Sequence, residues 1–166
     1  MTDATFRDLY SRYRDPLFRF GYRMTGSAEA SEDMVHDVFV SLYRGAFDPA
    51  RASASTYLFA GLRNQARKRL RDFGGEDEPA EDLTDDRSGP LETLLAVESA
   101  DQVRRAVEAL PFVQREAVIL FEYEELSLEE IARIVEAEVG TVKARLYRAR
   151  EGLRRSLGQR VREVAK

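Results

Sequence analysis

A segment rich in acidic residues, glycine and proline divides this chain of 166 residues into two parts of similar length. Residues 74–90 contain seven acidic residues, three glycines and two prolines, but only one basic residue, Arg87. Such a composition offers too little apolar surface to offset the entropy lost on ordering, so we expect a flexible acidic linker. The chain is therefore predicted to fold as two small domains, residues 1–73 and residues 91–166.

Apolar residues in the first part recur at the spacing of α-helices, and neither part shows an alternating strand pattern of useful length. Three helices are predicted, and serine residues are candidate caps for the second and the third. The predicted helices span residues 6–24, a segment from Ser27 or Ser31 to Tyr43, and a segment from Ser53 or Ser55 to about Arg71. The first part is thus expected to be a three-helix domain.

The second part shows the pattern of a helix-turn-helix, after two helices predicted over residues 91–110 and 112–123. Ser127 and Glu130 form a Ser-x-x-Glu capping box, which opens a short helix before a break at residues 136–138. A longer basic helix is predicted from about Val139 to beyond Leu157. The whole chain is therefore expected to be all-α.

The last helix has one apolar stripe, which we expect to be buried, and a second group of residues off that stripe. The stripe comprises Val142, Leu146, Ala149 and Leu153. The residues expected to point away from the stripe or to flank it are Thr141, Lys143, Ala144, Tyr147 and Arg148. Donors and small groups in the first turns of a basic helix suit contacts to bases and phosphates, although a solvated amphipathic helix has the same pattern.

The net charge of −4 does not by itself indicate a nucleic-acid partner, but the distribution of charge does. Residues 74–99 carry a net charge of −8, residues 1–73 carry +3, and residues 143–166 carry +7. Affinity for phosphate backbones depends on such local patches more than on the total.

A second basic run lies on the third predicted helix, close in sequence to aromatic residues. The run comprises Arg63, Arg67, Lys68, Arg69 and Arg71, and the aromatic residues are Phe47, Tyr57 and Phe59. Aromatic rings beside cations suit single-stranded DNA, whose bases stack while its phosphates are neutralised. A solvated charged face with aromatic residues in the core explains the same pattern.

Other classes of site have little support in the sequence. The chain has no cysteine, and its only histidine, His36, lies near Asp33 and Asp37 without a second histidine to complete a metal site. No phosphate loop or catalytic motif is present, so we expect neither an enzyme nor a cofactor. The start of the chain lacks a signal-peptide pattern and no long apolar run occurs, which favours a cytoplasmic protein without membrane insertion.

Ordered motifs in both parts resemble the extracytoplasmic-function (group IV) sigma factors of the sigma-70 family. The segments that resemble region 4 are residues 110–111, 114–118, 126–132 and 139–150. Those that resemble region 2 are residues 6–13, 31–39 and 56–64. The resemblance covers nearly the whole chain outside the linker. It implies a protein that binds core RNA polymerase and directs transcription initiation at promoters.

The resemblance also implies roles for individual residues. The clamp helices of polymerase would contact the second helix at Asp33, His36 and Asp37, and region 4 would contact the flap. Region 4 would read the minus-35 element through Thr141, Lys143, Ala144, Tyr147 and Arg148. Region 2 would bind the melted minus-10 strand through Phe47, Ser55, Tyr57, Arg63, Asn64, Arg67 and Lys68. Promoter DNA and an anti-sigma factor would be the further partners.

Three residues depart from the usual pattern of the family. Tyr57 stands where tryptophan is usual, His36 replaces a common glutamine, and Glu136 lies in a turn where glycine is frequent. A glutamate in that turn indicates either a strained backbone or a different turn geometry.

Two other functions are compatible with the residues alone. The chain could be a conventional helix-turn-helix regulator whose first domain mediates dimerisation or sensing. It could also be an interaction protein that binds polymerase or another partner without initiating transcription.

Overall fold

The computed structural model describes residues 1–73 and 99–164, with side chains to residue 158, and all the regular structure within these ranges is helical. The predicted linker, and the part of the predicted helix 91–110 that precedes Ser99, lie outside the described residues. No helix in the described ranges is both long enough and apolar enough to cross a membrane.

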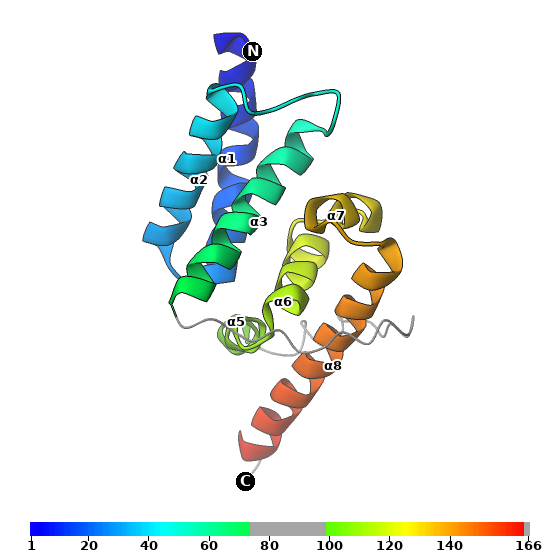
Figure 1. Ribbon diagram of the computed structural model, residues 1–166. Coiled ribbons are helices and arrows are strands. Elements are labelled where there is room, and N and C mark those ends of the chain that lie inside the picture. Colours follow the sequence, from blue (N-terminus) through cyan, green and yellow to red (C-terminus); the bar gives the residue numbers. More distant parts are fainter. Residues whose placement is uncertain (74–98, 165–166) are drawn as a thin grey trace.

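The first domain consists of three helices, as predicted (Figure 1). They are α1 (Asp3–Thr25), α2 (Ala28–Tyr43) and α3 (Ala54–Asp72). Of the alternative caps, Ser27 accepts a hydrogen bond from the backbone of Ala30, and Ser53 accepts one from the backbone of Thr56. Each serine thereby satisfies a backbone N–H that has no partner within the helix.

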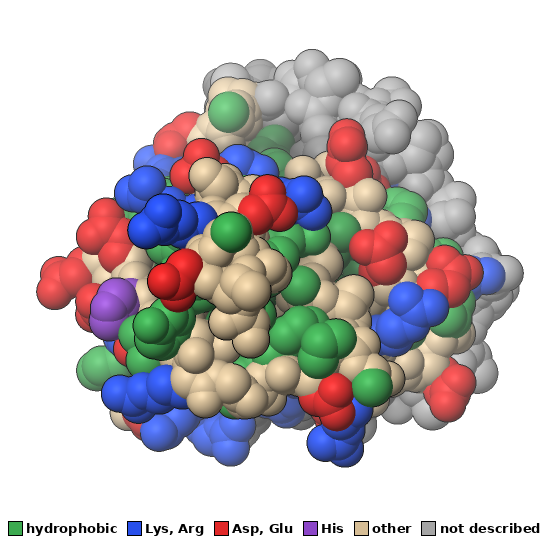
Figure 2. All heavy atoms as spheres, turned by 90° about the horizontal axis from the view of Figure 1, so that it is seen from above, with side chains coloured by type: hydrophobic (Ala, Val, Ile, Leu, Met, Phe, Trp, Pro, Cys, Tyr) green, Lys and Arg blue, Asp and Glu red, His purple; other side chains and the backbone are tan. Residues whose placement is uncertain are grey.

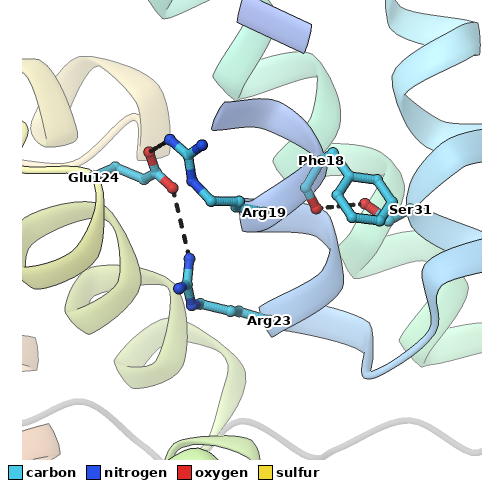
Figure 3. A network of polar contacts seen from close by, with 5 residues as sticks. All are labelled: Phe18, Arg19, Arg23, Ser31 and Glu124. Atoms are coloured by element: carbon cyan, nitrogen blue, oxygen red, sulfur yellow. Dashed lines mark hydrogen bonds and ion pairs between the residues drawn. The ribbon is translucent and has the colours of Figure 1, made fainter. Parts of the chain in front are cut away.

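Ser31 connects α1 to α2 instead of capping a helix. Its hydroxyl donates a hydrogen bond of 2.7 Å to the carbonyl of Phe18, as Figure 3 shows. A Cβ atom on Gly21 would lie 2.4 Å from the Ser31 hydroxyl oxygen. Glycine at position 21 is therefore what lets the two helices approach so closely.

The second domain contains α5 (Ala100–Glu108), α6 (Phe112–Val118), the π-helical turn η1 (Ile119–Tyr123), α7 (Leu128–Val135) and α8 (Val139–Val164). The expected helix over residues 112–123 is therefore continuous, but its last turn is wider than an α-helix. Ser127 caps α7 by accepting from the backbone of Glu130. That backbone hydrogen bond, of 3.1 Å, is one half of the expected capping box, and the Ser127 hydroxyl in turn donates to the carboxylate of Glu130 at 3.1 Å.

The two domains are packed against each other. Buried apolar residues from both belong to one contiguous core. Helix α3 packs against α7, and α1 contacts α5, α6 and η1. Figure 1 shows the three helices of the first domain on one side and α6, α7 and α8 on the other, with α8 running away toward the C-terminus. A linker and two domains were predicted, but not this docking.

The turn between α7 and α8 adopts the strained form. Glu136 ends α7 with φ 54° and ψ 50°, in the left-handed region. Its backbone N–H bonds to the carbonyl of Ala132. In this region the Cβ of an L-residue lies too close to its own backbone, so Glu136 destabilises the turn that glycine would form without strain.

We expect Glu136→Gly to raise the free energy of unfolding by about 0.5–1 kcal/mol, because relief of the Cβ clash exceeds the added flexibility of the unfolded chain. Urea denaturation followed by circular dichroism measures the change. The matched control is Glu129→Gly on the same helix, where φ is negative, and we expect a loss of about 1 kcal/mol there. Equal losses at both positions would contradict a strained turn.

Candidate nucleic-acid interface

The apolar stripe of α8 is buried as predicted. Val142, Ala149 and Leu153 are fully covered and Leu146 is 2% exposed. Of the residues expected off the stripe, Lys143 is exposed, whereas Thr141, Tyr147 and Arg148 are half-buried. The first turns of α8 therefore present polar and basic groups beside the N-terminus of a helix, where anions are favoured.

The prediction for Ala144 is wrong in one respect. Ala144 is only 2% exposed, so its side chain does not face solvent. Thr141, Tyr147 and Arg148 lie three or four positions away and therefore on the same helix face. A stripe pattern shows which side of a helix is apolar, but not that the opposite side is open.

Three residues predicted to contact the melted strand surround one hollow at the first turns of α3. Phe47, Tyr57 and Asn64 line this hollow of about 670 Å³. The ring centres of Phe47 and Tyr57 lie 5.2 Å apart. The Tyr57 hydroxyl forms a hydrogen bond of 2.7 Å with the hydroxyl of Ser41. Arg133 of α7 and Glu136, the residue that follows this helix, line the same hollow. Ser55 is half-buried and does not line it.

Arg63 does not lie on an open charged face, as the sequence suggested, because it is only 8% exposed. Its guanidinium donates two hydrogen bonds to the carboxylate of Glu116 on α6, at 2.7 and 3.1 Å. The guanidinium of Arg67 is half-buried and lies 5.8 Å from the ring centre of Phe112. Docking of α6, which no pattern within α3 could reveal, covers both arginines, whereas Asn64 and Lys68 remain exposed.

Glu116 is fully buried at the junction of three helices. Burial raises the pKa of its carboxyl above the ordinary value, and the hydrogen bonds and charge of Arg63 oppose that shift. Arg145 of α8 and Arg67 of α3 also favour the charged form. Sequence analysis did not select Glu116 as functional. The available signal was a charged pair, Arg115 and Glu116, within a short helix whose other residues, apart from Gln114, are apolar.

The residues expected to contact polymerase lie together on the surface of α2. Asp33, His36 and Asp37 are all exposed. The Nδ1 atom of His36 lies 3.8 Å from a carboxylate oxygen of Asp37. A carboxylate oxygen of Asp33 lies 3.9 Å from the guanidinium of Arg69 on α3. Figure 2 shows acidic side chains gathered beside the single histidine. Among the described residues, no group of three or more histidine, aspartate and glutamate side chains is arranged to hold a metal.

Two segments of the chain match models of known protein families. Residues 9–76 match Sigma-70 region 2, and residues 100–153 match Sigma-70, region 4. The chain is 32% identical to the ECF RNA polymerase sigma factor SigW of Bacillus subtilis, over 92% of this chain and 88% of that protein. The chain belongs to the ECF sigma factors of the sigma-70 family. It is accordingly a sigma factor that directs promoter-specific transcription.

Two further similarities extend over most of the sigma factor. It is 31% identical to the ECF RNA polymerase sigma-E factor of Escherichia coli K12, over 89% of this chain and 84% of that protein. Among solved structures it is similar to the sigma factor RpoE of Bartonella quintana in complex with the anti-sigma factor NepR. That similarity has a TM-score of 0.66 at 25% identity and covers 93% of this chain and 97% of the other.

A second set of polar contacts joins the two regions of the sigma factor on the α1 side. Glu124 follows η1, and its two carboxylate oxygens face the guanidinium groups of Arg19 and Arg23, as Figure 3 shows. The N···O distances are 3.3 Å to Arg19 and 3.8 Å to Arg23. The guanidinium of Arg23 lies 4.2 Å from the ring centre of Tyr123, whose hydroxyl pKa is raised by burial. Arg115 donates a hydrogen bond of 2.7 Å to the carbonyl of Met24. Arginines of region 2 thus meet carboxylates of region 4 at both edges of the interface.

We expect Glu116→Gln to lower the free energy of unfolding by about 3 kcal/mol, because an uncompensated guanidinium would remain buried at Arg63. Chemical denaturation of the full chain measures this loss. Glu129→Gln removes the same charge at an exposed site on α7, and we expect a change within about 0.5 kcal/mol there. A loss below about 1 kcal/mol for Glu116→Gln would contradict the importance of the buried pair.

Proposed function

We propose that this sigma factor reads a promoter at two points, with α8 in the major groove of the minus-35 element and the hollow beside α3 on the melted minus-10 strand. The observation that supports this most strongly is the arrangement of Phe47, Tyr57 and Asn64 around one hollow. Two aromatic rings and an amide suit a base that has left the stack, because rings stack on its face and the amide bonds to its edge.

The minus-10 strand would continue along α3 from that hollow. Lys68 and Asn64 are exposed, and Arg67 and Arg63 lie on the same helix. Cations at this position neutralise phosphates without reading sequence, while the hollow supplies the selectivity. Ser55 lies in the first turn of α3, where a hydroxyl suits a phosphate or sugar contact. Tyr57, in place of the usual tryptophan, still presents a ring, which the Ser41 hydroxyl holds in place.

Recognition of the minus-35 element would depend on the first turns of α8. Lys143 and Arg148 carry the charge there, and Thr141 and Tyr147 offer hydroxyl groups. Cations and a helix N-terminus hold a recognition helix on the DNA backbone while neighbouring donors reach base edges. Ala144 is excluded from direct readout while its methyl group is covered.

Core polymerase would bind through the exposed acidic residues of α2, Asp33, His36 and Asp37, against its clamp helices, and through region 4 against its flap. Carboxylates exposed on one helix surface suit a partner surface that carries basic side chains. The protein would act in the cytoplasm by binding alone, without catalysis or a cofactor. An anti-sigma factor is a further expected partner, because the similar B. quintana protein has one in its complex.

A run-off transcription assay with purified core polymerase and a library of promoter fragments tests the proposal. We expect transcripts from a subset of fragments that require both the sigma factor and the polymerase. Palindrome-selective DNA binding without polymerase would identify a conventional regulator instead. Binding to polymerase without transcripts would identify an interaction protein.

The recognition role of α8 is tested by Arg148→Ala. We expect about a tenfold decrease in initiation, because one backbone or base contact is lost, while affinity for core polymerase is unchanged. Arg155→Ala, seven residues further along α8 at an exposed position, is the matched control and should change initiation less than about twofold. Equal loss of initiation and polymerase binding for Arg148→Ala would contradict the assignment.

A further inference from the structure

Ser41 of α2 lies beside the aromatic rings of the hollow that the proposed function assigns to an unstacked base. It lines the hollow together with Phe47 and Tyr57. Its hydroxyl forms a hydrogen bond of 2.7 Å with the hydroxyl at the tip of the Tyr57 ring. The side chain of Tyr57 is therefore held at both ends, by its backbone in α3 and by Ser41.

The packing of α2 on α3 supports this pair of hydroxyls. A Cβ atom added at Gly61 of α3 would lie 3.5 Å from the side chain of Val38 on α2, which is ordinary van der Waals contact. Val38 is three positions before Ser41, and Gly61 is four positions after Tyr57, so both contacts lie on the same faces of their helices. Val38 is buried. Both contacts lie within region 2, so neither requires region 4.

The ring of Tyr57 has room to move without such a restraint. Tyr57 is only half-buried. Its ring centre lies 5.2 Å from that of Phe47, with the ring planes at 54°. Rings at this separation are in direct contact, so a base cannot enter between them and has to stack on the outside of the pair. A face that is already in position captures a base more readily, because ordering a side chain on binding costs conformational entropy.

We propose that Ser41 is a positioning residue for promoter opening, whose hydroxyl holds the Tyr57 ring as a fixed face for the base that leaves the duplex. The proposal rests on the proposed function of the hollow. In this role Ser41 acts through the ring of Tyr57 and not on the base. Tryptophan, which is usual at position 57 in the family, has no hydroxyl, so this pair is a feature of the present chain. Phenylalanine at position 57 would keep a ring but lose the restraint.

The test compares Ser41→Ala, Tyr57→Phe and the double variant in holoenzyme assembled with core polymerase. A promoter fragment that gives run-off transcripts carries 2-aminopurine, whose fluorescence rises on unstacking, in place of an adenine of its minus-10 element. We expect each single variant to open this promoter about fivefold more slowly, which is the effect of one lost hydrogen bond on a barrier. Affinity for the unopened promoter and for polymerase should stay the same. The double variant should be no slower than either single variant, because all three lose the same bond.

Two further variants separate positioning from other effects of the substitution. Ser41→Thr keeps a hydroxyl at the same position, and we expect its opening rate to be within about twofold of that of the unsubstituted protein. Ser11→Ala removes a serine hydroxyl at an exposed position on α1 and should leave the opening rate unchanged.

Two results would overturn the positioning role. Losses that multiply, to about 25-fold in the double variant, would show that Ser41 and Tyr57 act independently. A lower Tm for Ser41→Ala, with equal losses of polymerase affinity and opening rate, would show that Ser41 serves only the folding of region 2.

The two proposals fail separately. Absence of run-off transcripts from every fragment would overturn the proposed function, and the role of Ser41 with it. Transcription from a subset of fragments, with opening as fast in Ser41→Ala as in the unsubstituted protein, would overturn the role of Ser41 alone.

Discussion

The bidentate ion pair between Arg63 and Glu116 is the interaction on which the arrangement of the two regions depends. Transfer of either charge from water into the protein interior is costly, and only close, well-oriented hydrogen bonds offset that cost. Arg63 belongs to region 2 and Glu116 to region 4. When the regions separate, each charged group therefore loses the other as its hydrogen-bond partner. The pair therefore favours one docked orientation over others that would bury a charge without its partner.

The rest of the interface has the same chemical character. Arg19 and Arg23 of region 2 face Glu124 of region 4, and Arg115 donates to the Met24 carbonyl across the interface. Apolar residues of both regions are also in contact, within a common core. An interface that combines apolar contact with ion pairs differs from a domain core, because its charged groups regain solvation on opening. Such interfaces between domains are suited to reversible association.

The sequence was sufficient to predict features that lie within a single helix or turn. The buried stripe of α8 follows from spacing, and residue type left two candidate serines for each cap, of which Ser27 and Ser53 form the caps in the structure. The unusual turn at Glu136 was indicated by the resemblance to the family, and the structure has it. The burial of Arg63 and Ala144 could not be predicted in this way. Their exposure depends on what packs against α3 and on neighbours off the stripe, and the pattern of one helix contains no information about another helix docked on its polar face.

Salt acts differently on Glu116, which binds Arg63 in the structure, and on the DNA strand that we propose for the same helix. Binding of a strand releases counterions from its phosphates, so the affinity for DNA falls steeply as salt concentration rises. The carboxylate of Glu116 is fully buried beside its partner, and screening by salt acts weakly on such a pair. Higher ionic strength therefore favours the internal carboxylate over the external phosphate. Two factors thus favour the docked arrangement of the two regions: Glu116 is covalently attached and so has a high effective concentration at Arg63, and the buried pair is insensitive to salt.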